Sequence, residues 1–223
     1  MATEINRDEV LRITGLGGVL VVIRLDDLSQ SAALTRTLLD AGITSLEFTM
    51  TNPLALQVLT EIKKSFAEFE QGQAVIGAGT VLTPADARAA IAAGAQFIVT
   101  PALNFETIKV CTDQQVAIMP GALTPTEILS GWNAGASAIK VFPARAFGPG
   151  YFKDLREPLP QLKLVPTGGV SLENAAEFVR NGAIAVGVGG NLVDKNLVAA
   201  NNWAAIRQKA EALLEQVRIG RGK

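Results

Sequence analysis

The sequence contains no histidine, and its only cysteine is Cys111. These absences exclude Ser-His-Asp and Cys-His nucleophiles, histidine-ligated zinc, CxxC redox pairs and structural disulfides. Any catalysis must therefore use Lys, Glu, Asp, Arg, hydroxyl or backbone groups. Cys111 lies in a segment with helical spacing, which predicts a packing role for its side chain. An isolated thiol also fits a reducing compartment.

Charge and long apolar runs are scarce as well. Only 18% of the residues are charged, and 20 basic against 21 acidic residues give a net charge of −1, which does not indicate a nucleic-acid or basic membrane surface. No apolar run approaches the about 18 residues of a membrane span, and the N-terminus lacks a signal-peptide pattern. We therefore predict a cytoplasmic protein with a small-molecule partner and a disordered basic tail at 218–223.

What the sequence does contain is a regular alternation of short β-branched runs and longer segments with helical spacing. The predicted strands are 19–24, 45–49, 74–80, 96–100, 116–120, 136–142, 163–167 and 184–189. The predicted helices are 31–41, 53–66, 84–93, 105–114, 125–134, 172–181 and 202–217, and 148–156 is predicted to be mostly loop. An additional N-terminal helix is expected at 4–14, against the bottom or side of the domain.

The predicted helices begin and end with the same types of residue. A capping side chain precedes proline at 52–53, 83–84 and 124–125, which is the preferred arrangement at a helix start. Glycines at 42, 94, 135 and 182 follow helices, where a left-handed residue is favoured. Six to eight strand-helix repeats without a linker favour an α/β protein that forms a single (β/α)8 TIM barrel over residues 1–223, rather than an open doubly wound sheet.

In such a barrel, functional residues gather at the carboxyl ends of the strands. Side chains alternate along a strand, so Glu47 shares one face with Ser45 and Thr49 while the apolar residues between them face the helices. The same alternation directs Lys140 inward. A carboxylate and an amine are therefore predicted to project into one lumen.

Lys140 is the most informative residue, because an ammonium interrupts an otherwise apolar strand. Burial disfavours the charged form of a lysine and favours an amine that attacks carbonyl carbons. The alternative is a lysine at a strand end with its stem buried and its head in water. Glu47 has a structural alternative too, as an ion-pair partner of Lys140 or Arg24.

Other groups at the same predicted rim fit anions. The planar guanidinium of Arg24 suits a carboxylate or a phosphate, although a rim ion pair is its alternative. Glycine-rich segments follow the last two predicted strands, and loops at these places often bind phosphate through backbone N–H groups. Thr80 follows Gly-Ala-Gly at 77–79 and either faces the site or ends its strand in a tight turn.

Four segments together resemble one family. Leu-Glu-Phe-Thr at 46–49, Gly-Ala-Gly-Thr-Val at 77–81, Ile-Lys-Val-Phe-Pro at 139–143 and Pro-Thr-Gly-Gly-Val at 166–170 are similar to the 2-keto-3-deoxy-6-phosphogluconate (KDPG) aldolases, which include 4-hydroxy-2-oxoglutarate (KHG) aldolases. The resemblance implies a class I lyase that needs no metal or cofactor. It also implies a homotrimer, cleavage of KDPG to pyruvate and glyceraldehyde 3-phosphate, and a place in the Entner-Doudoroff pathway.

The resemblance also implies roles for particular residues. Lys140 matches the Schiff-base lysine, Glu47 the general acid/base and Arg24 an arginine that contacts the substrate carboxylate. The residues that match the substrate-binding and phosphate-binding positions are Thr49, Thr80, Pro101, Phe142 and Thr167, and Gly168, Gly169, Gly189 and Gly190, respectively.

Two positions depart from the pattern. Some members carry arginine where this chain has Thr51 and serine where it has Gly190, so a cation and a hydroxyl are missing from the predicted site. Preference for KHG, for the galactonate epimer of KDPG or for oxaloacetate decarboxylation therefore stays open. Two alternatives from other classes are a noncatalytic barrel that binds sugar phosphates and a metal-dependent aldolase. The absence of histidine argues against the latter.

Overall fold

The computed structural model describes residues 5–222, in which strands and helices alternate along the chain. The strands are β1 (Val19–Ile23), β2 (Ser45–Thr49), β3 (Val75–Gly79), β4 (Phe97–Val99), β5 (Ala117–Met119), β6 (Gly121–Ala122), β7 (Ile139–Val141), β8 (Leu164–Pro166) and β9 (Val186–Val188). Every paired strand runs parallel to its neighbour.

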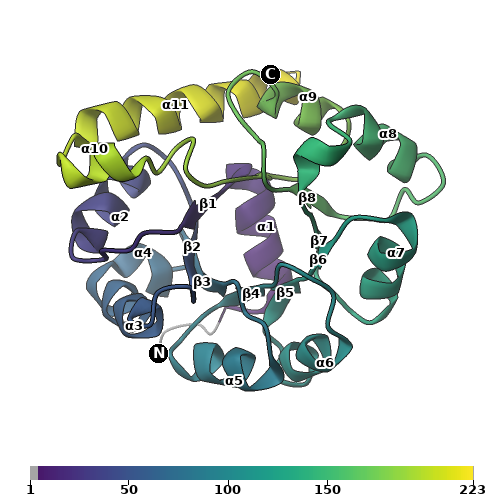
Figure 1. Cartoon of the computed structure of the whole chain (residues 1–223), viewed down its shortest axis with the longest axis horizontal. Coiled ribbons are helices and arrows are strands. Elements are labelled where there is room, and N and C mark those ends of the chain that lie inside the picture. Colours follow the sequence, from purple (N-terminus) through teal and green to yellow (C-terminus); the bar gives the residue numbers. More distant parts are fainter. Residues whose placement is uncertain (1–4, 223) are drawn as a thin grey trace.

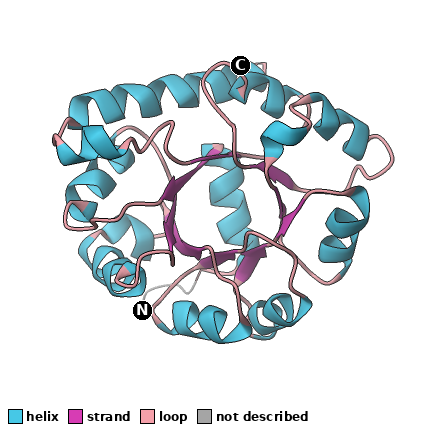
Figure 2. Cartoon of the chain, viewed as in Figure 1, coloured by secondary structure: helices cyan, strands magenta, loops and turns pink. Residues whose placement is uncertain are grey.

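The strands close into a ring, which Figure 2 shows end-on. The hydrogen-bonded orders are β5-β4-β3-β2-β1-β9 and β6-β7-β8. Bridges from Leu164 to Ala183 and from Thr167 to Gly187 join β8 to the β9 segment. Pro120, which has no N–H for the ladder, separates β5 from β6, so the predicted strand at 116–120 continues past this break. Counting β5 and β6 as one interrupted strand gives the (β/α)8 barrel that the sequence predicts.

The helices surround this ring, except for α1, which lies across it in the end-on view (Figure 1). They are α1 (Arg7–Gly17), α2 (Ser31–Asp40), α3 (Ala55–Ser65), α4 (Ala67–Glu70), α5 (Pro84–Ala92), α6 (Phe105–Asp113), α7 (Pro125–Asn133), α8 (Gly150–Arg156), α9 (Ala175–Arg180), α10 (Lys195–Ala199) and α11 (Trp203–Gly220), with a 3-10 turn η1 (Ala144–Ala146). None of those helices is both long and apolar enough to cross a bilayer.

The predicted helix starts are confirmed at two of three places. Thr83 and Thr124 form capping boxes at the starts of α5 and α7. Asn52 is not the N-cap of α3, which begins at Ala55: its side-chain oxygen accepts from the N–H of Leu54 before the helix starts, and its carboxamide nitrogen donates to the carbonyl oxygens of Leu25 and Asp26. The glycines after α2, α5, α7 and α9 have φ values of 95°, 98°, 96° and 100°, so the predicted left-handed residues are confirmed.

Several boundaries differ from the prediction. Residues 148–156, predicted to be mostly loop, contain α8, whose Phe152 is fully buried. The short helices α4 and α10 were not predicted. A disordered tail is wrong for 218–222, because α11 continues to Gly220 and the Arg221 guanidinium donates to the carbonyl oxygens of Gly15 and Leu16. Residue 223 and the predicted start of the first helix at residue 4 lie outside the described residues.

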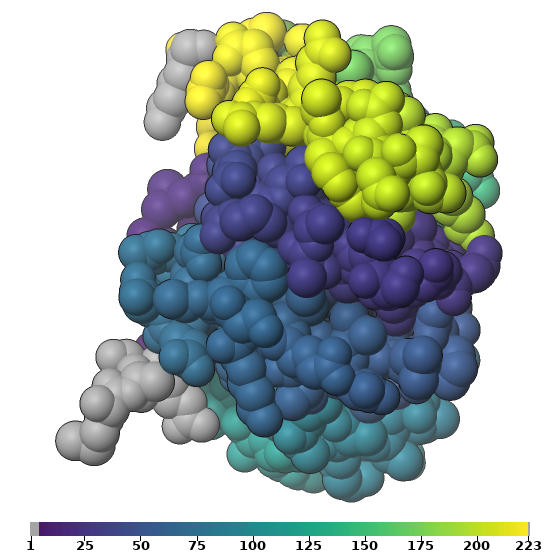
Figure 3. Space-filling view, turned by 90° about the vertical axis from the view of Figure 1, so that its left-hand side faces the viewer, coloured from purple at the N-terminus to yellow at the C-terminus, as the bar shows by residue number. Residues whose placement is uncertain are grey.

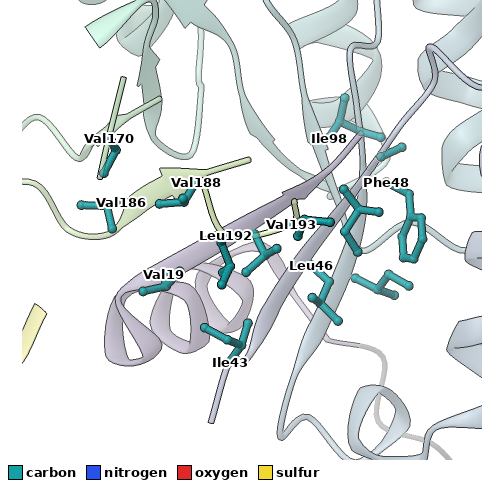
Figure 4. Close-up of a cluster of buried hydrophobic side chains, with 14 of the residues drawn as sticks. Val19, Ile43, Leu46, Phe48, Ile98, Val170, Val186, Val188, Leu192 and Val193 are labelled. Atoms are coloured by element: carbon teal, nitrogen blue, oxygen red, sulfur yellow. The ribbon is translucent and has the colours of Figure 1, made fainter. Parts of the chain in front are cut away.

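The alternation of side chains along the strands builds two apolar layers. The outer layer lies between the strands and the helices; Figure 4 shows part of it, with Leu46 and Phe48 from β2 among the labelled residues. The inner layer fills the lower lumen with strand residues such as Leu20 and Phe97, against Val10 and Ile13 of α1. Helix α1 therefore closes the amino-terminal end of the barrel, which leaves the carboxyl end as the open one.

The C-terminal helices close the outer wall beside the start of the chain. In Figure 3 the yellow-green segment that contains α10 lies against the purple N-terminal part. Lys195 at the start of α10 pairs with Asp26 after β1, with 2.6 Å between Nζ and Oδ2. Helix α11 also packs against α2 and α9. These contacts hold the loops after β1 and β9 next to each other at the rim.

Candidate active site

A cavity of about 450 Å³ opens at the carboxyl end of the barrel. It is lined by Val22, Arg24, Lys140, Phe142, Arg145, Thr167, Gly168, Gly169, Val170, Gly187, Gly189, Gly190 and Asn191. These residues come from the ends of β1, β7, β8 and β9 and from the loops that follow them. The lining contains three cationic side chains and no carboxylate, in a chain whose net charge is −1.

Lys140 occupies the middle of β7, between Gly121 of β6 and Val165 of β8. Its side chain is only 4% exposed, and Nζ lies 5.2 Å from the centroid of the Phe142 ring. Its strand neighbours Ile139 and Val141 belong to the outer apolar layer, so the predicted inward direction of Lys140 is confirmed. The amine therefore sits on the wall of the cavity, near the Phe142 ring.

Glu47 lies deeper, in the middle of β2, and is completely buried. Neither carboxyl oxygen has a hydrogen-bond partner among residues 5–222. Burial raises the pKa of Glu47, and the positive charges of Lys140 and Arg24 offset this increase only in part. Glu47 is therefore not a structural ion-pair partner, but a carboxyl group that holds its proton to higher pH than usual.

The room for Glu47 comes from Gly79 on the neighbouring strand β3. A Cβ atom at Gly79 would overlap the carboxyl group of Glu47. The next residue, Thr80, has a φ of 56°, a backbone conformation that costs energy in a residue other than glycine. The end of β3 is thus shaped around the Glu47 side chain.

Three of the predicted substrate contacts do not line the cavity. Thr49 is buried, donates to the carbonyl oxygen of Ile23 and shares a 2.9 Å hydrogen bond with the Thr51 hydroxyl. Thr80 and Pro101 are partly buried at the ends of β3 and β4, outside the set of lining residues. The cavity lining therefore lies on the β1, β7, β8 and β9 side of the barrel mouth, and the buried Glu47 of β2 is not among the lining residues either.

Arg24, Phe142 and Thr167 do line the cavity, as predicted. Arg24 is the first residue after β1, and its side chain is exposed at the mouth. The Thr167 hydroxyl is buried without a hydrogen-bond partner in the described part of the chain, and the missing side chain of Gly187 makes room for it. An unpaired hydroxyl at a cavity wall is available to a ligand.

The two glycine loops form one side of the mouth. Gly168 and Gly169 have φ values of 82° and 95°, in the left-handed region that favours glycine. The Asn191 side chain donates to the carbonyl oxygen of Val170 at 2.7 Å and ties the two loops together. Within residues 5–222, the backbone N–H groups of Gly168, Gly169 and Gly190 have no backbone acceptor.

Sequence reasoning missed Arg145 and Asn191 as lining residues. Arg145 follows β7 by four residues, so its position after a barrel strand was the available signal. Cys111, in contrast, is fully buried in α6, and burial raises the pKa of its thiol to about 12. The thiol is therefore no nucleophile at neutral pH, consistent with a packing role.

Comparisons with known proteins agree with this geometry. A family model described as "KDPG and KHG aldolase" matches residues 10–209. A 2-dehydro-3-deoxy-phosphogluconate aldolase from Treponema pallidum is 32% identical over 90% of this chain and 94% of its own length. A 2-dehydro-3-deoxy-6-phosphogalactonate aldolase from Escherichia coli is 33% identical over 78% of this chain and 83% of its own length.

A solved structure is similar as well. The KDPG aldolase of Legionella pneumophila, with pyruvate captured at low pH as a covalent carbinolamine intermediate, superimposes with a TM-score of 0.82. It shares 28% sequence identity, and the match covers 91% of this chain and 97% of that one. The chain therefore belongs to the KDPG and KHG aldolase family, and as an aldolase it is a lyase.

Proposed function

We propose that this protein is a class I aldolase that cleaves KDPG to pyruvate and glyceraldehyde 3-phosphate through a Schiff base on Lys140. The observation that carries the proposal is the placement of two groups in one lumen. A lysine amine with 4% exposure lines the cavity. The completely buried carboxyl group of Glu47 has no hydrogen-bond partner among the described residues and lies close enough for the charge of Lys140 to lower its pKa against the effect of burial. An amine and a proton carrier are the groups that imine formation needs.

Lys140 begins the reaction. Its neutral amine attacks the C2 ketone to give a carbinolamine, and loss of water leaves a protonated imine between Nζ and C2. Glu47 supplies the proton that the departing hydroxyl group takes away as water. Because burial raises its pKa, Glu47 retains that proton at a pH at which an exposed glutamate is ionised.

Glu47 then acts in the opposite direction. As a carboxylate it accepts the proton of the C4 hydroxyl, directly or through a water molecule, while the C3–C4 bond breaks and its electrons move into the imine. Glyceraldehyde 3-phosphate leaves, and the pyruvate enamine remains on Lys140. Protonation of C3 and hydrolysis of the imine release pyruvate and restore the amine.

The remaining site residues position the substrate in this proposal. Arg24 holds the carboxylate so that the keto carbon lies near Nζ, and Phe142 covers the imine. Thr167 offers its unpaired hydroxyl, and the backbone N–H groups of the two glycine loops receive the phosphate group. Thr49, Thr80 and Pro101 stay predictions from the family resemblance, because they lie outside the cavity lining.

The domain organisation, oligomeric state, cellular location and pathway are proposed from the family resemblance. We place the chain, as one barrel domain, in a homotrimer in the cytoplasm that acts in the Entner-Doudoroff pathway. A second candidate substrate is the galactonate epimer of KDPG, favoured by the similarity to the Escherichia coli phosphogalactonate aldolase. KHG, which would yield pyruvate and glyoxylate, and oxaloacetate remain candidates because the same imine serves all four.

The test is a comparison of kcat/KM for KDPG, its galactonate epimer, KHG and oxaloacetate, with pyruvate release measured in each case. We expect the highest value for KDPG. A higher value for KHG or for the epimer would replace the substrate assignment and leave the aldolase mechanism. If the folded protein released pyruvate from none of the four, the aldolase proposal would be wrong and a sugar-phosphate-binding protein would take its place.

A further inference from the structure

We infer that Arg145 is the side chain that makes this site selective for substrates with a phosphate group. The inference rests on the proposed function and names a residue that sequence reasoning does not find. Arg145 belongs to η1, the 3-10 turn between β7 and α8, and lines the cavity together with Arg24 and Lys140. It is the one cation of the lining that has no part in the proposed imine chemistry or in carboxylate binding.

Backbone contacts fix the position of Arg145 next to the phosphate loop. Its N–H donates to the carbonyl oxygen of Gly168 at 2.9 Å, and the N–H of Ala144 donates to that of Thr167 at 2.8 Å. Gly169 approaches so closely that a Cβ atom there would lie 3.3 Å from the Arg145 Cα atom. The turn that carries Arg145 is thereby attached to the loop of Gly168 and Gly169, which lines the cavity and whose N–H groups have no backbone acceptor in the described part of the chain.

The guanidinium of Arg145 is also free. The eight ion pairs among residues 5–222 do not include it, and its side chain is exposed at the mouth. A charged side chain that lines a cavity without a protein partner is available to an anion. Its planar donor fork matches a phosphate as well as a carboxylate. The N–H groups of Gly168, Gly169 and Gly190, which line the same cavity and have no backbone acceptor among the described residues, add donors for the third oxygen of a phosphate.

The charges of cavity and substrate agree with this assignment. A phosphorylated 2-keto acid carries one carboxylate charge and about two phosphate charges. Once the imine has formed, the cavity contains three positive charges, on the imine nitrogen, Arg24 and Arg145. Among residues 5–222, the lining contains no basic side chain besides Arg24, Lys140 and Arg145, and the ammonium of Lys209, which donates to the carbonyl oxygen of Asn191 at 3.4 Å, is not part of it. Within the lining, Arg145 is therefore the one side-chain charge left for the phosphate group.

The experiment compares Arg145→Gln and Arg145→Lys on KDPG and on 2-keto-3-deoxygluconate, which has the same carbon chain without the phosphate group. For Arg145→Gln we expect kcat/KM on KDPG to fall about 10- to 100-fold, mainly through KM, because a charge-assisted hydrogen bond to bound substrate is lost. On 2-keto-3-deoxygluconate we expect no more than about a 2-fold change. Arg145→Lys, which keeps the charge without the fork, should lie between Arg145→Gln and the unaltered protein.

Arg88→Gln on α5 is the matched control, since Arg88 is also exposed but lies outside the cavity lining. Arg88→Gln should leave kcat and KM unchanged for both substrates. An equal fall on both substrates in Arg145→Gln, or no fall on KDPG, would overturn the assignment.

A binding measurement separates this inference from the proposed function. Inorganic phosphate should bind the unaltered protein more tightly than Arg145→Gln, and this comparison needs no turnover. Trapping of pyruvate on Lys140 should be equal in both proteins. Loss of trapping in both would refute the Schiff-base proposal but not the phosphate contact, whereas equal phosphate binding would refute the role of Arg145 alone.

Discussion

The two ends of the barrel differ in whether their buried polar groups are hydrogen-bonded. At the amino-terminal end, the Thr14 and Ser45 hydroxyls share a 3.0 Å hydrogen bond, and Arg7 of α1 donates to the Ser137 hydroxyl and the Gly135 carbonyl oxygen. At the carboxyl end, both oxygens of Glu47 and the Thr167 hydroxyl are buried without a partner in the described residues.

This difference indicates that the amino-terminal end mainly stabilises the fold, whereas the carboxyl end contains the proposed active site. Buried polar groups are normally paired, because an unpaired one costs about 1–3 kcal/mol of stability. The amino-terminal end follows this rule, and its apolar layer continues into α1. The carboxyl end departs from it at the positions where the proposed reaction needs a proton carrier and a hydroxyl group. Ser31, Thr35, Thr107 and Arg156 on the surrounding helices also have a buried polar atom without a partner among the described residues, so the groups at the open end are distinguished by their place at the site and not by being unpaired alone.

Glu47→Gln should have the largest effect on turnover among the four substitutions and conditions that follow. The amide cannot accept or return a proton, so we expect kcat for KDPG to fall about 100- to 10,000-fold. Removal of an unpaired ionisable group should not lower the free energy of unfolding. Steady-state kinetics and denaturant unfolding check both parts, and unchanged kcat would exclude the proton-carrier role.

Gly79→Ala should have the next largest effect. A Cβ atom at this position would overlap the Glu47 carboxyl group and displace it. A displacement of about 1 Å can lower turnover about 100-fold. The matched control is Gly15→Ala in α1 at the closed end, where nothing lies within 4 Å of the added atom.

The control should raise helix stability by about 0.5–1 kcal/mol and leave kcat unchanged. Equal kinetic effects of the two substitutions would show that Gly79 does not position Glu47.

Ile13→Ala tests the closed end directly. Ile13 is 5% exposed and packs in the lower lumen, so its truncation should cost about 2–5 kcal/mol of unfolding free energy. Because this layer lies beneath the site, kcat of the folded fraction should change little. Urea unfolding and active-site titration together separate the two quantities. A large loss of kcat with intact stability would contradict the division of roles between the two ends.

The pH dependence of stability should show the smallest effect. The pKa of Glu47 is above its unfolded value of 4.5 in the folded protein, so the folded state binds more protons between the two values. The free energy of unfolding should therefore decrease as pH rises through that window. The same titration of Glu47→Gln should lack this component. If the free energy of unfolding changed with pH by the same slope in both proteins, the pKa of Glu47 would not be raised in the folded state.

Much of the fold follows from the sequence, because the relevant signals are local. Alternation in β2 and β7 places Glu47 and Lys140 inward, and the Thr-Pro pairs at 83–84 and 124–125 mark helix starts. The features that were missed depend on tertiary contacts. Helix α8 is stabilised by burial of Phe152 against Phe178, and the end of α11 by the contacts of Arg221 with α1.

The site shows the same limit. Sequence reasoning identifies side chains at strand ends, and Arg24, Lys140, Phe142 and Thr167 indeed line one cavity. It cannot show that Gly79 makes room for Glu47, or that Arg145 is attached to the Gly168 loop, because both facts depend on how close two strands or loops approach. The substrate-binding roles of Thr49, Thr80 and Pro101 stay predictions, because these residues are not among those that line the cavity.

The central claim is that Lys140 forms a covalent imine with the keto acid. Incubation with pyruvate and sodium borohydride, followed by intact-mass and peptide mass spectrometry, tests it most directly. We expect one reduced pyruvate adduct per chain, located on Lys140, and no adduct in Lys140→Arg. Failure of the folded protein to form an adduct, or an adduct that persists in Lys140→Arg, would contradict the claim.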